Sequence, residues 1–264
     1  MPKAIGIYRE TNLGVKVGLD KRILDLTAEE LRKKGFEIEL IAPERFNEDM
    51  QADLVLTMAR GEDINKLLVK KEKENVIIIN RPEAIRFSFN RKEVYKKMMS
   101  LGADIPRTDF VEINNISFSN INRKVIFKPT NRHEFFFIIE KEEDFNKAIE
   151  EYKKAGITEI IIQDFIEGMT TKYYAINNEI LLPQAADNFS KEILERIKYQ
   201  AILSGVASGL KIFGGDFMVT QNKAFCVDTN DWPSFSVNEN LTQEVASIKI
   251  ANFIEREYNN YKKK

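Results

Sequence analysis

Two aspartates and one asparagine near the carboxyl-terminal part of the chain have side chains that could bind a divalent cation. Asp216 lies in the segment 213–220, Asp228 ends the segment 224–228, and Asn230 follows two residues later. Both segments alternate as short strands do, and residues 221–223 between them predict a hairpin loop. Carboxylate and amide oxygens are hard ligands suited to Mg²⁺, which keeps several waters and shares its shell with substrate phosphates.

The alternation within this hairpin predicts its register. If Thr220 pairs with Ala224, one face is apolar and holds Phe217, Val219, Phe225 and Val227, whereas the other holds Asp216, Met218, Thr220, Ala224, Cys226, Asp228 and Asn230. Asp216 then lies directly opposite Asp228, which is unfavourable unless a positive charge lies between them. The alternative is a solvated face with two unrelated aspartates, because short motifs produce many false matches.

The composition indicates a globular protein and excludes several kinds of site. The chain has 264 residues and a net charge of −1, which argues against a general binder of nucleic acid or membrane surfaces. One cysteine, Cys226, and one histidine, His133, exclude an intramolecular disulfide and a zinc site of the His/Cys type. The start lacks the apolar core of a signal peptide, and we expect a cytoplasmic protein.

Strands and helices alternate over the first third of the chain, which predicts a parallel sheet of βαβ units. The expected strands are 3–8, 36–42, 53–58 and 76–80, and the expected helices are 21–34 and 64–71. Arg81-Pro82 interrupts this pattern before a helix at 90–101. The later segments mix hairpin-like strands with helices at 142–155, 191–208 and 241–258, as in a distinct α+β unit.

Four motifs in a fixed order resemble those of the ATP-grasp superfamily. They are Asn80–Ile85 with Asn90–Lys92 and Ile105–Thr108, then Val125–Pro129, then Ile160–Gly168, and finally Gly214–Phe217 with Val227–Asn230. Each motif alone is weak, but four in this order are a strong signal, and the resemblance covers essentially the whole chain. The resemblance implies an α/β, Rossmann-like pre-ATP-grasp domain over residues 1–87 and a two-lobed α+β ATP-grasp domain over 88–264. The lid lobe is expected at about 113–168 and the metal-binding lobe at about 169–264.

The resemblance implies ATP and Mg²⁺ as cofactors, with Mn²⁺ as an alternative ion. Lys92 and Lys128 are expected to reach the ATP phosphates, and Lys172 is expected to face phosphate or substrate as a catalytic residue. The metal ligands implied by the resemblance are Asp216, Asp228 and Asn230.

The resemblance also implies an adenosine site at the end of the third motif. Gln163 is expected to accept a hydrogen bond from the adenine amino group, and the residues that follow are expected to contact the base. These residues are Asp164, Phe165 and Ile166. Thr170 or Glu167 is expected to bind the ribose hydroxyls.

Two features depart from the superfamily pattern. The superfamily has a glycine-rich flap after the Lys128-Pro129 motif, whereas residues 130–137 contain no glycine. Either Arg132, as a second catalytic residue, and His133 contact phosphate through their side chains, or the lid closes poorly. The second departure is that no arginine directly precedes Asp216. The candidates for binding an anionic substrate are Arg9, Arg60, Arg91 and Arg132. Each of these could instead be a solvated arginine.

The resemblance implies an ADP-forming ligase. It would activate a small-molecule or peptide carboxylate as an acyl phosphate for attack by an amine. Two alternatives stay open: an ATP-grasp kinase of a small hydroxylated substrate, and a nucleotide-binding protein that has lost catalysis. Neither nucleic acid nor membrane is expected as a partner, and a homodimer is left open.

Overall fold

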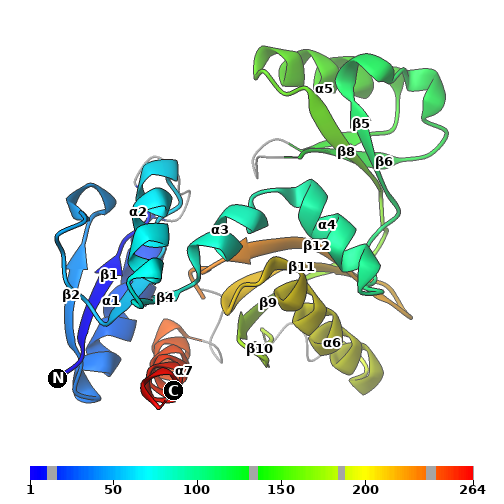
Figure 1. Ribbon diagram of the computed structural model, residues 1–264. Coiled ribbons are helices and arrows are strands. Elements are labelled where there is room, and N and C mark those ends of the chain that lie inside the picture. Colours follow the sequence, from blue (N-terminus) through cyan, green and yellow to red (C-terminus); the bar gives the residue numbers. More distant parts are fainter. Residues whose placement is uncertain (11–16, 131–135, 184–187, 236–241, 264) are drawn as a thin grey trace.

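The computed structural model describes residues 1–10, 17–130, 136–183, 188–235 and 242–263 and contains three four-stranded sheets. Figure 1 shows that the sheet formed by β5, β6, β7 and β8 stands apart from the other two, with α3 and α4 lying on its near side, against the carboxyl-terminal sheet. The mixed α/β character expected from the sequence is confirmed. None of the described helices is long and apolar enough to span a membrane.

The amino-terminal sheet is parallel and has the strand order β2-β1-β3-β4. Its strands are β1 Lys3–Ile7, β2 Glu37–Ile41, β3 Leu54–Thr57 and β4 Ile77–Ile79, and its crossover helices are α1 Val17–Lys33 and α2 Glu62–Lys73, with a short 3₁₀ turn at Pro43–Arg45. Leu54 and Leu56 pack toward α1, whereas Val55 packs toward α2. Both faces of the sheet are therefore covered, as parallel sheets require.

Two helices follow β4, where the sequence pattern predicted only one. They are α3 Pro82–Ser88 and α4 Arg91–Ser100. Pro82 occupies the first turn of α3, where its missing N–H leaves no hydrogen bond unmade. Arg81-Pro82 therefore starts a helix here, and the expectation of an interruption was wrong.

The lid sheet is antiparallel, with the strand order β5-β8-β6-β7. Its elements are β5 Thr108–Glu112, β6 Val125–Pro129, β7 Phe137–Ile139, α5 Glu142–Lys154 and β8 Glu159–Asp164, with 3₁₀ turns at Ile113–Asn115 and Phe118–Asn120. Phe127 and Ile160 pack with Phe145 and Tyr152 of α5. Residues of alternate parity, such as Lys128, lie on the opposite face of this sheet.

The carboxyl-terminal sheet is also antiparallel and has the strand order β10-β9-β11-β12. Its elements are β9 Met169–Ile176, β10 Glu179–Leu181, α6 Lys191–Ser208, β11 Ile212–Val219, β12 Ala224–Asp231 and α7 Gln243–Lys262. Helix α6 covers one face through Ile197 and Ala201, which pack with Phe213 and Phe217.

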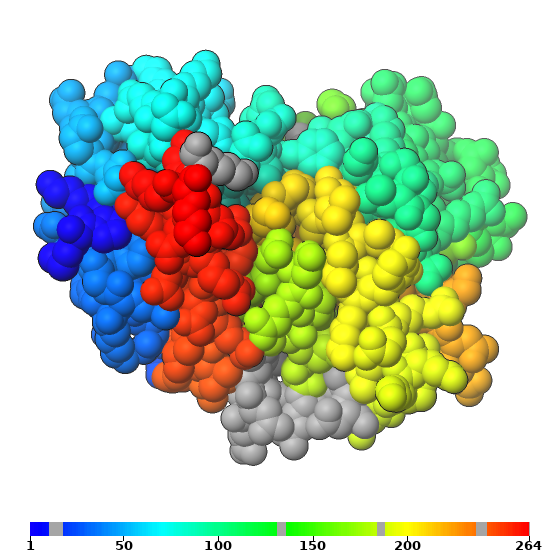
Figure 2. All heavy atoms as spheres, turned by 60° about the horizontal axis from the view of Figure 1, so that its bottom comes forward, coloured from blue at the N-terminus to red at the C-terminus, as the bar shows by residue number. Residues whose placement is uncertain are grey.

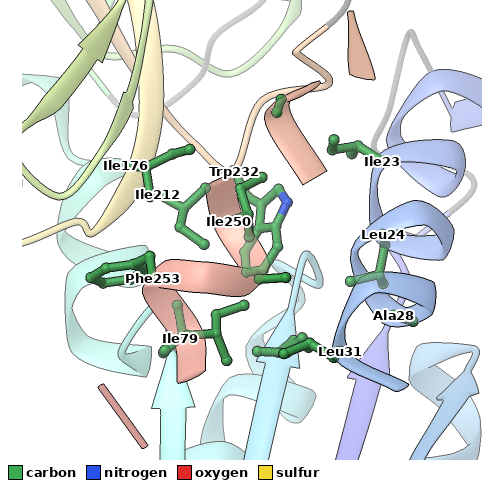
Figure 3. Packing of buried hydrophobic residues seen from close by; sticks show 14 of the residues in the cluster. Ile23, Leu24, Ala28, Leu31, Ile79, Ile176, Ile212, Trp232, Ile250 and Phe253 are labelled. Carbon is green, nitrogen blue, oxygen red and sulfur yellow. The ribbon is translucent and has the colours of Figure 1, made fainter. Parts of the chain in front are cut away.

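One buried cluster joins the amino-terminal sheet to the carboxyl-terminal sheet. Trp232 is fully buried and lies between Ile23 and Leu24 of α1 on one side and Ile212 of β11 on the other (Figure 3). Helix α7 runs along this junction, between the first elements of the chain and the carboxyl-terminal sheet (Figure 2). The boundary expected at residue 87 stays a prediction, because this core is shared across it.

Asn80, directly after β4, connects the two sheets by hydrogen bonds. Its Nδ2 donates to the Ile212 carbonyl oxygen at 2.7 Å, and its Oδ1 accepts from the N–H groups of Lys211 and Ile212 at 2.8 and 2.9 Å. The side chain is 1% exposed. It therefore bonds to the start of β11 as a neighbouring strand would.

We expect Asn80→Ala to lower the free energy of unfolding by about 2–4 kcal/mol, because three buried hydrogen bonds are lost and backbone groups of β11 are left unpaired. Urea unfolding would measure this loss. The matched control is Asn65→Ala, which removes one half-buried bond to the Pro82 carbonyl oxygen at 2.9 Å and should cost about 1 kcal/mol or less. Equal losses in the two variants would contradict the assigned role of Asn80.

Candidate functional site

Three charged residues lie side by side on one face of the carboxyl-terminal sheet. Asp216 of β11 pairs with Lys172 of β9 and with Asp228 of β12. Side chains of directly paired residues project from the same face of a sheet. The predicted opposition of Asp216 and Asp228 is therefore confirmed, and Lys172 lies beside them.

Protein cations lie next to both carboxylates. The Lys172 Nζ donates to Asp216 Oδ1 at 2.8 Å, and the Arg91 Nη2 donates to Asp228 Oδ1 at 3.5 Å. The Asn230 Nδ2 donates to Asp228 Oδ2 at 2.7 Å, which turns the amide oxygen of Asn230 away from that carboxylate. Each aspartate has an opposite charge close by, so their mutual repulsion is offset.

The predicted assignment of side chains to the two faces of the hairpin is wrong between Asp216 and the hairpin loop. The register shifts by one residue between Asp216 and Phe217, so that Phe217 pairs with Cys226 and Val219 with Ala224. The buried face consequently holds Phe217, Val219, Ala224 and Cys226, with Phe225 and Val227 only half-buried. A β-bulge with Val227 as the extra residue accommodates both registers in one hairpin.

The bulge exposes the carbonyl oxygen of Val227 to side-chain donors from two other elements. The Tyr95 hydroxyl of α4 donates to it at 2.7 Å, and the Lys128 Nζ of β6 donates to it at 3.0 Å. The lid sheet, α4 and β12 thus meet at one atom, one residue before Asp228.

Lys128 is held between the lid and the carboxyl-terminal sheet. Its Nζ also donates to Gln163 Oε1 at 2.8 Å, and the residue is 8% exposed. Burial, together with the nearby positive charge of Arg91, lowers the pKa of Lys128 to about 8. Its ammonium group therefore loses its proton much more readily than that of an ordinary lysine.

Gln163 is 1% exposed, and both ends of its side chain bond within the lid. Its Oε1 accepts from Lys128, and its Nε2 donates to Thr108 Oγ1 at 3.1 Å. The side chain therefore orients Lys128. A contact between Gln163 and adenine stays a prediction.

The linker after β8 is tied to the loop before β6. The Asp164 carboxylate accepts a hydrogen bond from Arg123 Nε. The centre of the Phe165 ring lies 4.4 Å from Lys124 Nζ, and the backbone N–H of Phe165 donates to the Lys124 carbonyl oxygen at 3.2 Å. Ile166 is half-buried, and Thr170 is exposed and donates to the Met218 sulfur at 3.2 Å. Their expected contacts with adenosine stay predictions.

Arg91, and not Lys92, is the cation that α4 directs at the aspartate pair. Lys92 forms an ion pair with Glu159 of β8 and lies 5.9 Å from the ring centre of Phe110. Asn90 caps the helix by accepting from the Glu93 N–H at 3.2 Å, which places Arg91 at the first turn, beside β12. The expected contact of Lys92 with the ATP phosphates stays a prediction.

Two further candidate arginines, the buried Arg9 and the half-buried Arg60, form ion pairs at the end of β12. Arg9 bonds Asp20 at 2.6 Å and lies 3.8 Å from Asp231, and Arg60 lies 2.5 Å from Asp231. Both are thus paired and not solvated. Arg132 and His133 lie outside the described residues.

Asp216, Asp228 and Asn230 carry the hard oxygen atoms that Mg²⁺ prefers, and their expected role as metal ligands stays a prediction. No group of three or more His, Cys, Asp or Glu side chains that could hold a metal occurs within the described parts of the chain. Two carboxylates and the Asn230 amide oxygen would leave the remaining positions to phosphate oxygens and water, which is the usual arrangement for Mg²⁺.

Solved structures resemble this chain along its whole length. A D-alanine–D-alanine ligase from Bacillus anthracis, free and complexed with ATP, has TM-scores of 0.76 and 0.77 at 13% and 12% identity, with 100% of this chain and 99% of that chain covered. A RimK domain ATP-grasp protein from Sphaerobacter thermophilus has a TM-score of 0.72 at 13% identity, with 96% and 99% covered. No family model and no curated protein sequence matches the chain.

These likenesses establish the fold. The chain has the ATP-grasp fold, as its four sequence motifs predicted.

We expect the buried Lys128 to make the stability of the protein depend on pH. Its folded pKa of about 8 lies below the ordinary value of 10.5, so the unfolded chain binds more protons between these values and stability rises with pH there. Relative to Lys128→Met, the wild-type protein should gain about 2–3 kcal/mol of unfolding free energy between pH 7.5 and 10.5.

Urea unfolding of both proteins across this range would measure the gain. Lys198→Met, which removes a more exposed lysine, serves as the control. A difference between wild type and Lys128→Met that stayed constant with pH would refute the shifted pKa.

Proposed function

We propose that this protein is an ADP-forming ligase that uses Mg-ATP to join a carboxylate to an amine. The observation that carries the proposal is the convergence of three cations at the facing carboxylates of Asp216 and Asp228. Lys172 and Arg91 bond to these carboxylates, and Lys128 bonds to the carbonyl oxygen of the residue before Asp228. The ligase activities named for the solved structures of the same fold support it, and one of those structures contains ATP.

The reaction would proceed in two displacements. An oxygen of the substrate carboxylate attacks the γ-phosphorus of ATP, the bond to the bridging oxygen breaks, and ADP leaves. The amine nitrogen then attacks the acyl carbon, phosphate leaves, and the nitrogen loses a proton. Phosphoryl transfer of this kind needs positioning and neutralisation of charge more than covalent help from the protein.

The residues of this chain would bind and neutralise. Asp216, Asp228 and Asn230 would hold Mg²⁺, which would supply positive charge that offsets the charge developing on the phosphates. Lys172 and Arg91 now pair with these aspartates, and a bound cation would free both side chains to turn toward phosphate. This exchange of partners would couple metal binding to nucleotide binding.

Removing either carboxylate should abolish turnover. In Asp216→Asn and in Asp228→Asn, we expect ADP release to fall by about a hundredfold or more, because phosphate charge is no longer neutralised by the metal. Asp104→Asn is the matched control, since Asp104 has similar exposure and also pairs with one arginine, Arg196 at 3.1 Å. The screen would offer amino acids and small acids with Mg-ATP and measure ADP.

The same screen separates the reaction classes. ADP release that requires a carboxylate and an amine together supports the ligase, whereas a stable phosphorylated alcohol would identify a kinase. An unchanged rate of ADP release in both aspartate variants would refute the proposed site.

Arg91 and Lys92 provide a second test. We expect Arg91→Met to weaken Mg-ATP binding by about tenfold or more, because a cation beside the phosphates is lost. Lys92→Met removes the ion pair with Glu159 and the cation over the Phe110 ring, and it should weaken Mg-ATP binding less than about threefold. Calorimetric titration would measure both affinities, and a larger effect at Lys92 would restore that residue as the phosphate ligand.

A further inference from the structure

The Val227 carbonyl oxygen accepts hydrogen bonds from two side chains of different character. Tyr95 is 4% exposed and packs in the same cluster as Val94, Met98 and Phe217. A tyrosine has few rotatable bonds, and its ring is enclosed by this cluster, so its hydroxyl is fixed. Lys128, the other donor, has a flexible four-carbon stem.

The bulge at Val227 determines which face of the sheet Asp228 occupies. Toward the hairpin loop, Val219 pairs with Ala224, and continuing that register would set Val227 opposite Asp216 and Asp228 opposite Gly215. A shift of one residue moves a side chain to the other face. Without the bulge, Asp228 would therefore leave the side of the sheet that holds Asp216 and Lys172.

We propose that Tyr95 is a positioning residue that preserves this bulge when Lys128 turns from Val227 to the phosphates of the nucleotide. The inference rests on the proposed function, because it requires Lys128 to bind phosphate. In the free protein, two donors serve one carbonyl oxygen. In the nucleotide complex, the Tyr95 hydroxyl alone keeps that oxygen bonded and Asp228 opposite Asp216.

The Val227 carbonyl oxygen lies in a part-buried place. A carbonyl shielded from water is destabilising without a donor, whereas the loss of one of two donors leaves it satisfied. Tyr95→Phe should therefore do little to the free protein, in which Lys128 remains at 3.0 Å from the oxygen. The cost should appear when ATP draws Lys128 away.

A matched pair of tyrosine variants tests this prediction. Tyr152 is also buried, and its hydroxyl donates to a backbone oxygen, that of Phe127, at 2.9 Å. Tyr95→Phe should weaken Mg-ATP binding by about tenfold, with a midpoint of urea unfolding close to that of Tyr152→Phe. Tyr152→Phe should leave the affinity within about twofold of wild type. Equal affinities in the two variants would overturn the role of Tyr95.

A double-mutant cycle in the free protein tests the shared carbonyl without any nucleotide. Tyr95→Phe should cost more stability in a Lys128→Met background than in wild type, because the Val227 oxygen then loses both donors. Strictly additive losses would overturn the shared carbonyl whatever the nucleotide result. If wild type fails to bind Mg-ATP while the cycle is non-additive, the proposed function fails and the role of Tyr95 is confined to holding the bulge.

Discussion

Carboxylates that face each other across a sheet repel, and in this chain cations from three other elements lie beside the facing pair Asp216 and Asp228 and offset that repulsion. Lys172 comes from the neighbouring strand, Arg91 from the start of α4, and Lys128 from the lid sheet. The lid, α4 and the carboxyl-terminal sheet therefore meet where negative charge is concentrated. A nucleotide and its cation would bind where Asp216 already pairs with Lys172 and Asp228 with Arg91.

Strand β12 and the residue directly after it lie in three different environments. Cys226 lies in the core against α6, and burial raises the pKa of its thiol to about 11, which makes it an unreactive packing residue. Asp228 lies on the face of the sheet that holds Asp216 and Lys172, and Trp232, just beyond the strand, enters the core shared with α1 and α7. The bulge at Val227 divides the first environment from the second and allows one strand to serve both.

The sequence predicts the fold well because its signals are local or come in a fixed order. Alternation and the order of four motifs sufficed for the sheets and for the opposition of Asp216 and Asp228. The bulge escapes this reasoning because both registers are locally plausible, and only packing of Ala224 and Cys226 against α6 selects the second one. The choice between Arg91 and Lys92 likewise depends on the cap at Asn90, which fixes how α4 is rotated. Gln163 was assigned by its neighbours in the sequence, whereas its bonds to Lys128 and Thr108 join separate strands.

The ion pairs of Asp231 have a mechanical consequence. Asp231 lies three residues beyond Asp228, a distance of roughly 10 Å along an extended strand. It forms ion pairs with Arg9 and Arg60, which follow β1 and β3. A rotation of the amino-terminal sheet would therefore pull on the same strand that carries Asp228 and Asn230. Strand β12 would then transmit a tilt of the amino-terminal sheet to the spacing of the oxygen atoms of Asp228 and Asn230.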